Sequence, residues 1–409
     1  MAHDATAQLE NDHDAAPPAL VIAPDCRHYR GDRPCPQNRL CGGCGHYEPY
    51  GHRVCVIKLA ALGDVIRTLC VLPGVRQRYP DAHITWVSLP GACRLLREHA
   101  LIDRVLTFDA LQALRLEQER FDLVISLDKE AEPAALAMAM SAKRKMGIGL
   151  SPQGTPIPLN PEAESYFALG LSDEMKFRRN RKSYPQLIYE ALGWPYGGEQ
   201  YELRVQPARQ HAVRQKLCAL GWRPQHPTLG INVGAANTYA NKMWPAQRIA
   251  DLVERLRLGQ VVPQVLLLGG AAERPVVDSI LKHLAAHNAI NGVIDAGTDH
   301  DEPTFVATVD TCDALFCGDT MAMHVANALA KGLIAVFGPT CEQEVQFFGQ
   351  GLKLVAHVPC APCYKRVCDH GDACIHQTSI GDAIGAIRNV LARCTGAAQP
   401  AAPPQTRAA

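Results

Sequence analysis

An acid, a hydroxyl and an imidazole lie close together near residue 320. The apolar run 314–317 stops at Gly318, and Asp319 and Thr320 follow directly. A helix is expected to start there, with His324 one turn further on. Ligands of open α/β sheets bind at the carboxyl ends of strands, and helix N-termini favour phosphate. An ordinary N-capped helix with a surface histidine explains the same residues, so this motif needs support from elsewhere.

A second junction of this kind lies far upstream, in residues 58–66 (KLAALGDVI). The pattern predicts a strand, a loop of small residues and a helix start, with Gly63 allowing a tight turn. Asp64 then lies at or near the helix N-terminus, where a carboxylate could act as a general base. Lys58 could reach a phosphate or tune Asp64. By itself, the segment is better explained by a simple N-cap.

The second half of the chain contains two further loops that follow expected strands. Residues 230–235 lead into Asn241 and Lys242, where backbone N–H groups could cradle phosphate and the lysine could neutralise charge. A solvated loop is the alternative. Glu273 follows Gly269 and Gly270 and could accept ribose hydroxyls, or could be an ordinary first-turn acid. The loop is not GxGxxG, so it gives no argument for NAD or FAD.

Three motifs carry a resemblance to a known family: Leu-Gly-Asp ending at Asp64, Asn241-Lys242 followed by Met-Trp-Pro, and Asp319-Thr320 with His324. The chain resembles glycosyltransferase family 9, the heptosyltransferases of lipopolysaccharide core assembly, over residues 53–394. The resemblance implies an α/β protein of the GT-B type, with two Rossmann-like doubly wound domains facing a cleft. It also implies inverting transfer, with the acceptor on the first domain and a nucleotide sugar, typically ADP-heptose, on the second.

The resemblance also assigns roles to single residues. Asp64 would deprotonate an acceptor hydroxyl, and Lys242 would stabilise the leaving phosphates together with the backbone near Asp319 and Thr320. His324 would lie close to the donor, and Glu273 would hold the ribose. The predicted substrate-binding residues also include Lys58, Gly63, Asn241 and Met321. No metal is needed for departure of the leaving group.

Met321 departs from the family pattern, which has a small residue, often glycine, after Asp-Thr or Asp-Ser. A side chain at this position narrows the donor pocket or turns outward. A basic cluster is a further feature of the first domain: Lys176, Arg178, Arg179, Arg181 and Lys182. Arg179 and Arg181 are the candidates for binding a phosphorylated or anionic acceptor. A solvated charged loop explains the cluster equally well.

Eight of the sixteen cysteines form two compact groups: Cys26, Cys35, Cys41 and Cys44 near the start, and Cys360, Cys363, Cys368 and Cys374 near the end. Each group has the ligand count of a tetrahedral thiolate site for zinc or mononuclear iron, and neither fits a standard Fe–S run. Free or disulfide-linked cysteines are the alternative, and one site drawing on both groups is a third arrangement. The second group resembles the iron-binding finger of autotransporter heptosyltransferases, which modify protein. We expect a structural role for both sites.

Composition limits the classes of function. Lys+Arg and Asp+Glu are both 41 in 409 residues, so the zero net charge gives no argument for nucleic-acid binding. No apolar run reaches transmembrane length, and the N-terminus has no signal-peptide core. The expectation is a cytoplasmic protein, with peripheral membrane contact through the basic cluster left open.

Strand-like and helix-like segments alternate along the chain. Expected strands are 54–59, 83–87, 104–108, 123–127, 145–148, 228–232, 265–268, 293–295, 314–317 and 333–337. Expected helices are 65–78, 131–141, 185–192, 246–258, 273–286, 303–311, 322–330 and 380–393. The predicted order is a disordered 1–25, a Cys-rich 26–50, an acceptor domain 51–195 and a donor domain 196–355. A Cys-rich finger 356–378, a helix 379–394 packing back on the first domain, and a disordered 395–409 follow.

The function predicted is an inverting glycosyltransferase that moves heptose from ADP-heptose to a glycolipid or glycan acceptor of the lipopolysaccharide type. The first alternative is a protein heptosyltransferase with an iron finger. A rival of another class is a non-catalytic, metal-dependent protein that binds nucleotide sugars, and the presence of Asp64 speaks against it. A nucleotide-sugar epimerase is a weaker rival.

Overall fold

The computed structural model describes residues 19–234, 240–370 and 374–396. The chain separates into two compact units, residues 1–51 and 52–409. The predicted disordered ends, where they fall in 1–18 and 397–409, lie outside the described residues, as do residues 235–239 of the predicted phosphate loop.

The described part of the first unit, residues 19–51, consists of turns. One isolated bridge pairs Cys26 with Pro49, and backbone bonds join Arg27 to Glu48 and Tyr50 to Asp25. Arg27 and Glu48 also form an ion pair of 2.8 Å. These contacts close the segment into a loop without a helix or a longer strand.

The first lobe of the larger unit is a six-stranded sheet in the order β3-β2-β1-β4-β5-β6. Its strands are β1 Arg53–Ile57, β2 His83–Ser88, β3 Arg104–Thr107, β4 Arg120–Ser126, β5 Ser141–Leu150 and β6 Pro156–Pro158. All neighbours pair in parallel except β5 and β6. The central strands are apolar and buried on both faces, as parallel sheets covered by helices require.

Five helices connect these strands: α1 Leu62–Thr68, α2 Val71–Arg78, α3 Pro90–Leu96, α4 Ala110–Gln118 and α5 Ala131–Ala139. The expected single helix 65–78 is therefore wrong, because the chain forms two helices there. Pro73 has no N–H to donate to the Leu69 carbonyl, and its ring crowds that carbonyl. The residues before it bond three positions back instead, from Leu69 to Ile66 and from Cys70 to Arg67.

An irregular segment leads from the first lobe to the second. It contains the short turns η1 Pro161–Ala163 and α6 Glu164–Ala168, a π-helix η2 Glu174–Arg179, and helices α7 Tyr184–Ala191 and α8 Pro207–Ala219. The sequence pattern missed α8, because Val213 and Leu217 are its only buried side chains. Pattern-based prediction depends on a wider apolar stripe.

The second lobe is a parallel sheet in the order β12-β11-β10-β7-β8-β9. Its strands are β7 Thr228–Asn232, β8 Gln264–Leu268, β9 Val293–Asp295, β10 Ala314–Gly318, β11 Gly332–Phe337 and β12 Gly351–Val355. Its helices are α9 Ala246–Leu258, α10 Arg274–Ala286, α11 Glu302–Asp310, α12 Met321–Ala328 and α13 Ile380–Thr395. Short helical turns are η3 Ala240–Lys242, η4 Ala271–Glu273, η5 Glu342–Glu344 and η6 Cys374–Gln377. Strands β7 and β9 and helix α9 match the predicted bounds, and α3, α4 and β12 were not predicted.

Helix α13 does not pack back on the first lobe, so that prediction is wrong. Its apolar positions Ala383, Ile387, Val390 and Leu391 belong to the core of the second lobe, against α9 and strands β10 to β12. Ser379 caps its start by accepting a bond from the Asp382 N–H, and Gly396 ends it in the left-handed region. The helix thus covers the sheet that its own lobe provides.

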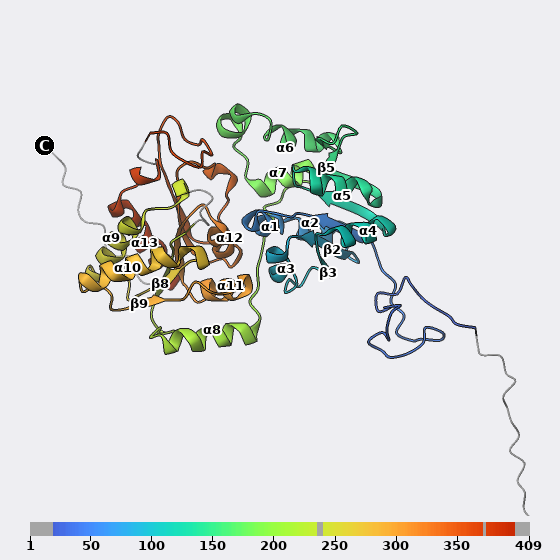
Figure 1. The fold of residues 1–409 in the computed structure, drawn as a ribbon, viewed down its shortest axis with the longest axis horizontal. Coiled ribbons are helices and arrows are strands. Elements are labelled where there is room, and N and C mark those ends of the chain that lie inside the picture. Colours follow the sequence, from blue (N-terminus) through green and yellow to red (C-terminus); the bar gives the residue numbers. More distant parts are fainter. Residues whose placement is uncertain (1–18, 235–239, 371–373, 397–409) are drawn as a thin grey trace, which may run out of the picture. The chain divides into compact units, whose positions relative to one another are not determined.

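The two lobes touch through apolar contacts as well as polar ones. Helix α1 packs against α12 and α3 against α11, and one core cluster includes Ile66 and Leu69 together with Ala322 and Met323 (Figure 1). Arg94 and Glu302 add an ion pair of 2.5 Å between α3 and α11. Among the described residues, none of the helices has both the length and the apolar run that crossing a bilayer requires.

Candidate active site

Lys58 lies at the end of β1 and is buried. Its ammonium pairs with Asp128, which follows the neighbouring strand β4, and donates to the Ala60 carbonyl at 2.9 Å. Asp128 also accepts the Leu59 N–H at 2.5 Å. Burial alone would lower the pKa of Lys58, but the charge of the Asp128 carboxylate outweighs burial and raises it. For Asp128, burial raises the pKa of the carboxyl and outweighs the opposite effect of the Lys58 charge. The contact is that of an ion pair, so Lys58 acts on Asp64 through its charge and is not positioned as a free phosphate ligand.

Asp64 lies in the first turn of α1, and its side chain is 37 % exposed. Burial by itself raises the pKa of this carboxyl. The Arg67 guanidinium at 2.8 Å, then Lys58 and His324, outweigh burial and hold the pKa below its usual value. Asp64 is therefore a carboxylate at neutral pH with one face open to solvent.

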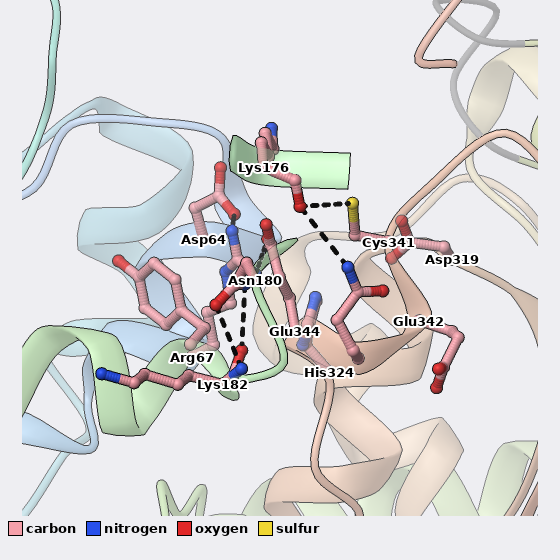
Figure 2. A network of polar contacts seen from close by, with 12 residues as sticks. Asp64, Arg67, Lys176, Asn180, Lys182, Asp319, His324, Cys341, Glu342 and Glu344 are labelled. Atoms are coloured by element: carbon pink, nitrogen blue, oxygen red, sulfur yellow. Dashed lines mark hydrogen bonds and ion pairs between the residues drawn. The ribbon is translucent and has the colours of Figure 1, made fainter. Parts of the chain in front are cut away.

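Arg67 links Asp64 to the second lobe. Its guanidinium lies 3.6 Å from the Glu344 carboxylate (Figure 2). The centre of the guanidinium lies 3.8 Å from the centre of the Tyr184 ring. Burial opposes the charge of Arg67, but Asp64 and Glu344 raise its pKa well above the usual value. Arg67 was not among the predicted site residues, although a cation three residues after an acid on a helix is a recognisable signal.

The second junction joins β10 to α12. Thr320 occupies the N-cap position of α12, and its hydroxyl lies 3.4 Å from the Asn232 amide at the end of β7. Asp319 lies 3.5 Å from the Lys242 ammonium. A side chain at Gly318 would lie 2.0 Å from the Lys242 carbonyl oxygen, so glycine is what allows η3 to approach this strand end. The structure thus brings together the predicted residues of two motifs that are 77 positions apart in the sequence.

His324 is buried on α12, 6 % exposed, and meets the first junction directly. A side chain at Gly63 would lie 2.9 Å from its ring carbon Cδ2 and 3.5 Å from the Met321 Cα. Gly63 therefore serves the close approach of the two lobes; its backbone does not have the positive φ that a glycine-specific turn would need. Burial, followed by the charge of Arg67, lowers the pKa of His324 to about 4, so the imidazole is neutral at pH 7.

The other predicted donor-site residues lie on the second lobe. The Glu273 carboxylate accepts the Gly270 N–H at 2.9 Å, and its side chain covers the position where Gly234 would carry a Cβ. Asn241 donates to the Lys365 carbonyl at 3.1 Å, in the predicted finger. Met321 begins α12 and packs against the core that the two lobes share. Its side chain therefore contributes to the lobe contact.

The basic cluster divides into residues with different partners. Arg178 donates to the carbonyls of Pro359 and Ala361 at 3.1 and 2.9 Å, so it holds the finger. Lys176 lies 4.0 Å above the Tyr364 ring, which stacks on Phe177. Arg179 pairs with Glu174 at 3.3 Å, and Lys182 pairs with Glu190. Arg181 lines a groove between the lobes, together with Tyr196, Gln346 and Lys353.

The C-terminal cysteines gather in this finger. Burial raises the pKa of Cys374, and the neighbouring thiols Cys363, Cys360 and Cys368 raise it further, so the four lie near one another. The finger is tied to the lobe by Trp244, whose indole N–H donates to the Ile375 carbonyl at 3.0 Å. Trp244 is buried and its ring packs against Phe316.

Among the described residues, no disulfide joins the cysteines of either group. Backbone N–H groups around Arg39 and Gln37 lower the pKa of the Cys35 thiol. Neither tetrad has three thiols within 4.8 Å of one another; in the part of the chain that the structure describes, the group with that spacing is Glu254, His283 and His287. The metal predictions for the tetrads thus stay predictions.

A family model for glycosyltransferase family 9 (heptosyltransferase) matches residues 111–373, more than half of the chain. The chain belongs to this family. It is accordingly a glycosyltransferase. It is 26% identical over 338 residues to lipopolysaccharide heptosyltransferase 1 of Pseudomonas aeruginosa, covering 78% of this chain and 88% of that protein. It is 26% identical over 323 residues to lipooligosaccharide heptosyltransferase 2 of Haemophilus influenzae, covering 71% of this chain and 84% of that one.

Solved structures of the family share the fold. The glycosyl transferase family 9 protein of Veillonella parvula matches with a TM-score of 0.67 at 19% identity, over 84% of this chain and 98% of that one. ADP-heptose lps heptosyltransferase II of E. coli matches with a TM-score of 0.63 at 17% identity, over 83% of this chain and 99% of that one. The iron-containing dodecameric glycosyltransferase TibC of enterotoxigenic E. coli matches with a TM-score of 0.50 at 11% identity, over 84% of this chain and 77% of that one. The predicted α/β architecture of two Rossmann-like lobes is confirmed.

Proposed function

We propose that this family 9 enzyme transfers heptose from ADP-heptose to a glycolipid acceptor of the lipopolysaccharide type, with inversion at the anomeric carbon. One observation carries the proposal. The first turn of α1, which presents the ionised Asp64, lies against the first turn of α12, so that Gly63 touches His324. The same turn follows Asp319 and Thr320 at the strand end where a donor phosphate would bind. Asp64, the proposed base for the acceptor hydroxyl, and the start of α12, the proposed binding site for the donor phosphates, therefore face the same space.

The chemistry assigned to these groups is a single displacement. The Asp64 carboxylate takes the proton from an acceptor hydroxyl, and that oxygen bonds to the anomeric carbon. The bond from this carbon to the diphosphate oxygen breaks, and ADP leaves. Lys242 and the free N–H groups at the start of α12 stabilise the charge on the departing phosphates. Glu273 holds the ribose in this proposal.

The acceptor would enter along the first lobe. Arg181 and Lys353 line the groove between the lobes, and Arg181 has no acidic side chain as an ion-pair partner among the described residues. A guanidinium in that position suits a phosphate or carboxylate on a core sugar. Because such acceptors are anchored in lipid, the enzyme would work at the inner face of the cytoplasmic membrane as a peripheral protein. A protein acceptor is the alternative, which the likeness to TibC and the Cys-rich finger favour.

We further propose that the two tetrads hold structural zinc or iron. Each offers four thiols outside any disulfide, which is the donor set of a closed site. A bound ion would tie together loops that lack regular structure and would take no part in the transfer. Metal analysis of the purified protein should find one equivalent less in Cys363→Ser/Cys368→Ser than in the wild type, and likewise one equivalent less in Cys41→Ser/Cys44→Ser. Unchanged metal content in both pairs would contradict the assignment.

Calorimetry with ADP, ADP-heptose and the UDP and GDP sugars tests the donor. We expect selective binding of ADP-heptose, weakened in Lys242→Ala and Asp319→Ala, and unchanged in Lys182→Ala, whose lysine pairs with Glu190 instead. Preference for another nucleotide would overturn the heptosyltransferase assignment while leaving the fold intact. Supplying a lipopolysaccharide core acceptor and a protein acceptor in parallel then separates the two acceptor classes.

A further inference from the structure

Tyr201 and Asn327 lie behind His324, on the side away from Asp64. Tyr201 comes from the segment before α8, and Asn327 lies on α12 one turn after the histidine; both are buried. The Tyr201 hydroxyl lies 3.1 Å from the His324 Nδ1 and 2.7 Å from the Asn327 Nδ2. We propose that Tyr201 and Asn327 are positioning residues that hold His324 as the tautomer with its proton on Nε2, aimed at the bound donor. The role toward the donor rests on the function proposed above.

The orientation of the Asn327 amide is set by the backbone. Its Oδ1 accepts the Phe348 N–H at 2.9 Å, and its Nδ2 donates to the Gln346 carbonyl at 2.8 Å. A flipped amide would place two acceptors together at Gln346 and two donors together at Phe348. Nδ2 therefore also donates to the Tyr201 oxygen.

The remaining proton assignments follow from this amide. Because the Tyr201 oxygen already accepts from Asn327, its single O–H is directed to the other neighbour, the His324 Nδ1. If Nδ1 carried the proton instead, the Tyr201 hydroxyl would lack an acceptor inside the protein. A buried hydroxyl that donates to nothing is destabilising, because it gives up its bond to water without replacement. The neutral imidazole thus keeps its proton on Nε2.

The Nε2 atom is the part of the ring that remains for a ligand. It has no hydrogen-bond partner among the described residues, and it lies 3.7 Å from the position where a Gly63 Cβ would be. Asp64, Asp319 and Lys242 act on the ring from the surrounding elements. In this setting His324 donates a hydrogen bond to an oxygen of the bound nucleotide sugar. It does not compete with Asp64 as the base, because the lone pair on Nδ1 is taken by Tyr201.

Two-bond ¹H–¹⁵N correlation spectra of the full-length protein, labelled at histidine nitrogen, test the tautomer directly. His324→Gln assigns the His324 signals by their loss. We expect the Nε2–H pattern in the wild type and in Tyr189→Phe, which loses a buried tyrosine bond to the Cys70 carbonyl away from the site. Tyr201→Phe should shift to a mixture of tautomers. An Nδ1–H pattern in the wild type, or an unchanged pattern in Tyr201→Phe, would overturn the proposal, whether or not the protein uses ADP-heptose.

Kinetics test the positioning role once transfer is established. Tyr201→Phe should lose about fivefold in kcat, the effect of one hydrogen bond, while Tyr189→Phe keeps its rate. At position 324, glutamine places an N–H near the Nε2 position and asparagine does not. We therefore expect His324→Gln to be faster than His324→Asn. Equal rates for these two amides would contradict a donor at Nε2.

A second and independent observation concerns the outer face of the second lobe. His283 lies in the last turn of α10, His287 is the C-cap residue directly after that helix, and Glu254 faces them from α9. The Glu254 Oε2 lies 2.9 Å from the His283 Nε2 and 2.8 Å from the His287 Nδ1, and Asp251 lies 3.7 Å from the same His283 atom. We propose that these residues form a binding site for a divalent transition metal ion.

The donor set fits such an ion better than magnesium or calcium. Two imidazole nitrogens and one or two carboxylates suit zinc, copper or nickel. The ligand atoms of Glu254, His283 and His287 all lie within 4.8 Å of one another, so side-chain adjustments would place them around one ion at about 2.0–2.1 Å. His287 and Asp251 are partly exposed, which leaves the site open to solvent. The bound ion would link α9 to α10.

Zinc titration of the full-length protein tests this site against the cysteine sites. We expect His283→Gln/His287→Gln to bind one equivalent of zinc less than the wild type. His211→Gln, which changes a histidine on the exposed face of α8, should bind as much zinc as the wild type. Zinc should also raise the unfolding temperature by a larger amount in the wild type than in the double variant. Equal stoichiometry and equal stabilisation would show that the cluster is only a set of hydrogen bonds between two helices.

Discussion

The two strand-to-helix junctions that meet at the site share a topology and differ in charge. At the β1–α1 junction Asp64 is partly exposed and ionised, whereas at the β10–α12 junction His324 is buried and neutral. Arg67 contributes to both states, because its positive charge lowers the pKa of the carboxyl and of the imidazole. A single cation at the lobe contact therefore favours a proton acceptor on one side and a neutral hydrogen-bond donor on the other.

The largest effect should come from removing the charged group of the first junction. Asp64→Asn keeps the shape and loses the base, so we expect kcat to fall about 10²–10⁴-fold while binding of ADP-heptose is retained. Glu132→Gln is the matched control, since Glu132 is an exposed acid in the first turn of α5, a helix of the same lobe. A rate loss below tenfold in Asp64→Asn would place the base elsewhere.

Pushing the two junctions apart should have the next largest effect. In Gly63→Ala the new methyl group meets the His324 ring at 2.9 Å, so the loop or the helix must shift. A displacement approaching 1 Å costs on the order of 10²-fold in kcat/KM, and the variant should lose about 1–3 kcal/mol of stability. Gly385→Ala, where the added methyl meets nothing within 4 Å, should keep its activity. Equal behaviour of the two variants would show that the lobes do not depend on this contact.

The neutral state of His324 predicts a pH dependence of stability. As the pH falls below 6.5 the unfolded chain binds a proton at this histidine, but the folded protein does not until about pH 4. The folded state therefore loses stability as the pH falls through this window, by about 2 kcal/mol between pH 7 and pH 5. Denaturant unfolding of the wild type and His324→Gln at both values isolates this difference. Parallel pH profiles for the two proteins would mean that the imidazole is protonated in the folded state.

Removing Arg67 should have the smallest of these effects, a change in the pH at which Asp64 is ionised. Without Arg67, the burial of Asp64 is less well compensated, so the pKa of this carboxyl rises. The base must be ionised, and the rate in Arg67→Gln should therefore begin to fall at a higher pH than in the wild type. Profiles of kcat/KM between pH 4 and 8 measure the shift. Arg94→Gln, which loses a different ion pair between the lobes, should keep the wild-type profile.

Local patterns predicted the parts of the site that depend on neighbouring residues. The strand ends, the small loops and the acids after them placed Asp64 and Asp319 correctly at helix starts. The partners of these residues were missed because they come from distant segments: Asp128 lies 70 positions from Lys58, and Tyr201 lies 123 positions from His324. Spacing in the sequence carries no signal for such pairs.

The finger shows the same limit of local reasoning. Arg178 was assigned to an anion-binding cluster from its charge alone, but it donates to the carbonyls of residues 359 and 361. Helix α13 was placed on the wrong lobe because an apolar stripe shows that a helix packs, and does not show against which sheet. The apolar positions themselves were predictable from their spacing.

The central claim is tested most directly by the products of the wild-type enzyme with ADP-heptose and a heptose-deficient lipopolysaccharide core. Release of ADP and the anomeric configuration of the new glycoside are measured in one reaction. We predict ADP release that requires the acceptor, and a product of inverted configuration. Release of ADP without an acceptor, retention of configuration, or no reaction with this acceptor while a protein acceptor is modified would contradict the account.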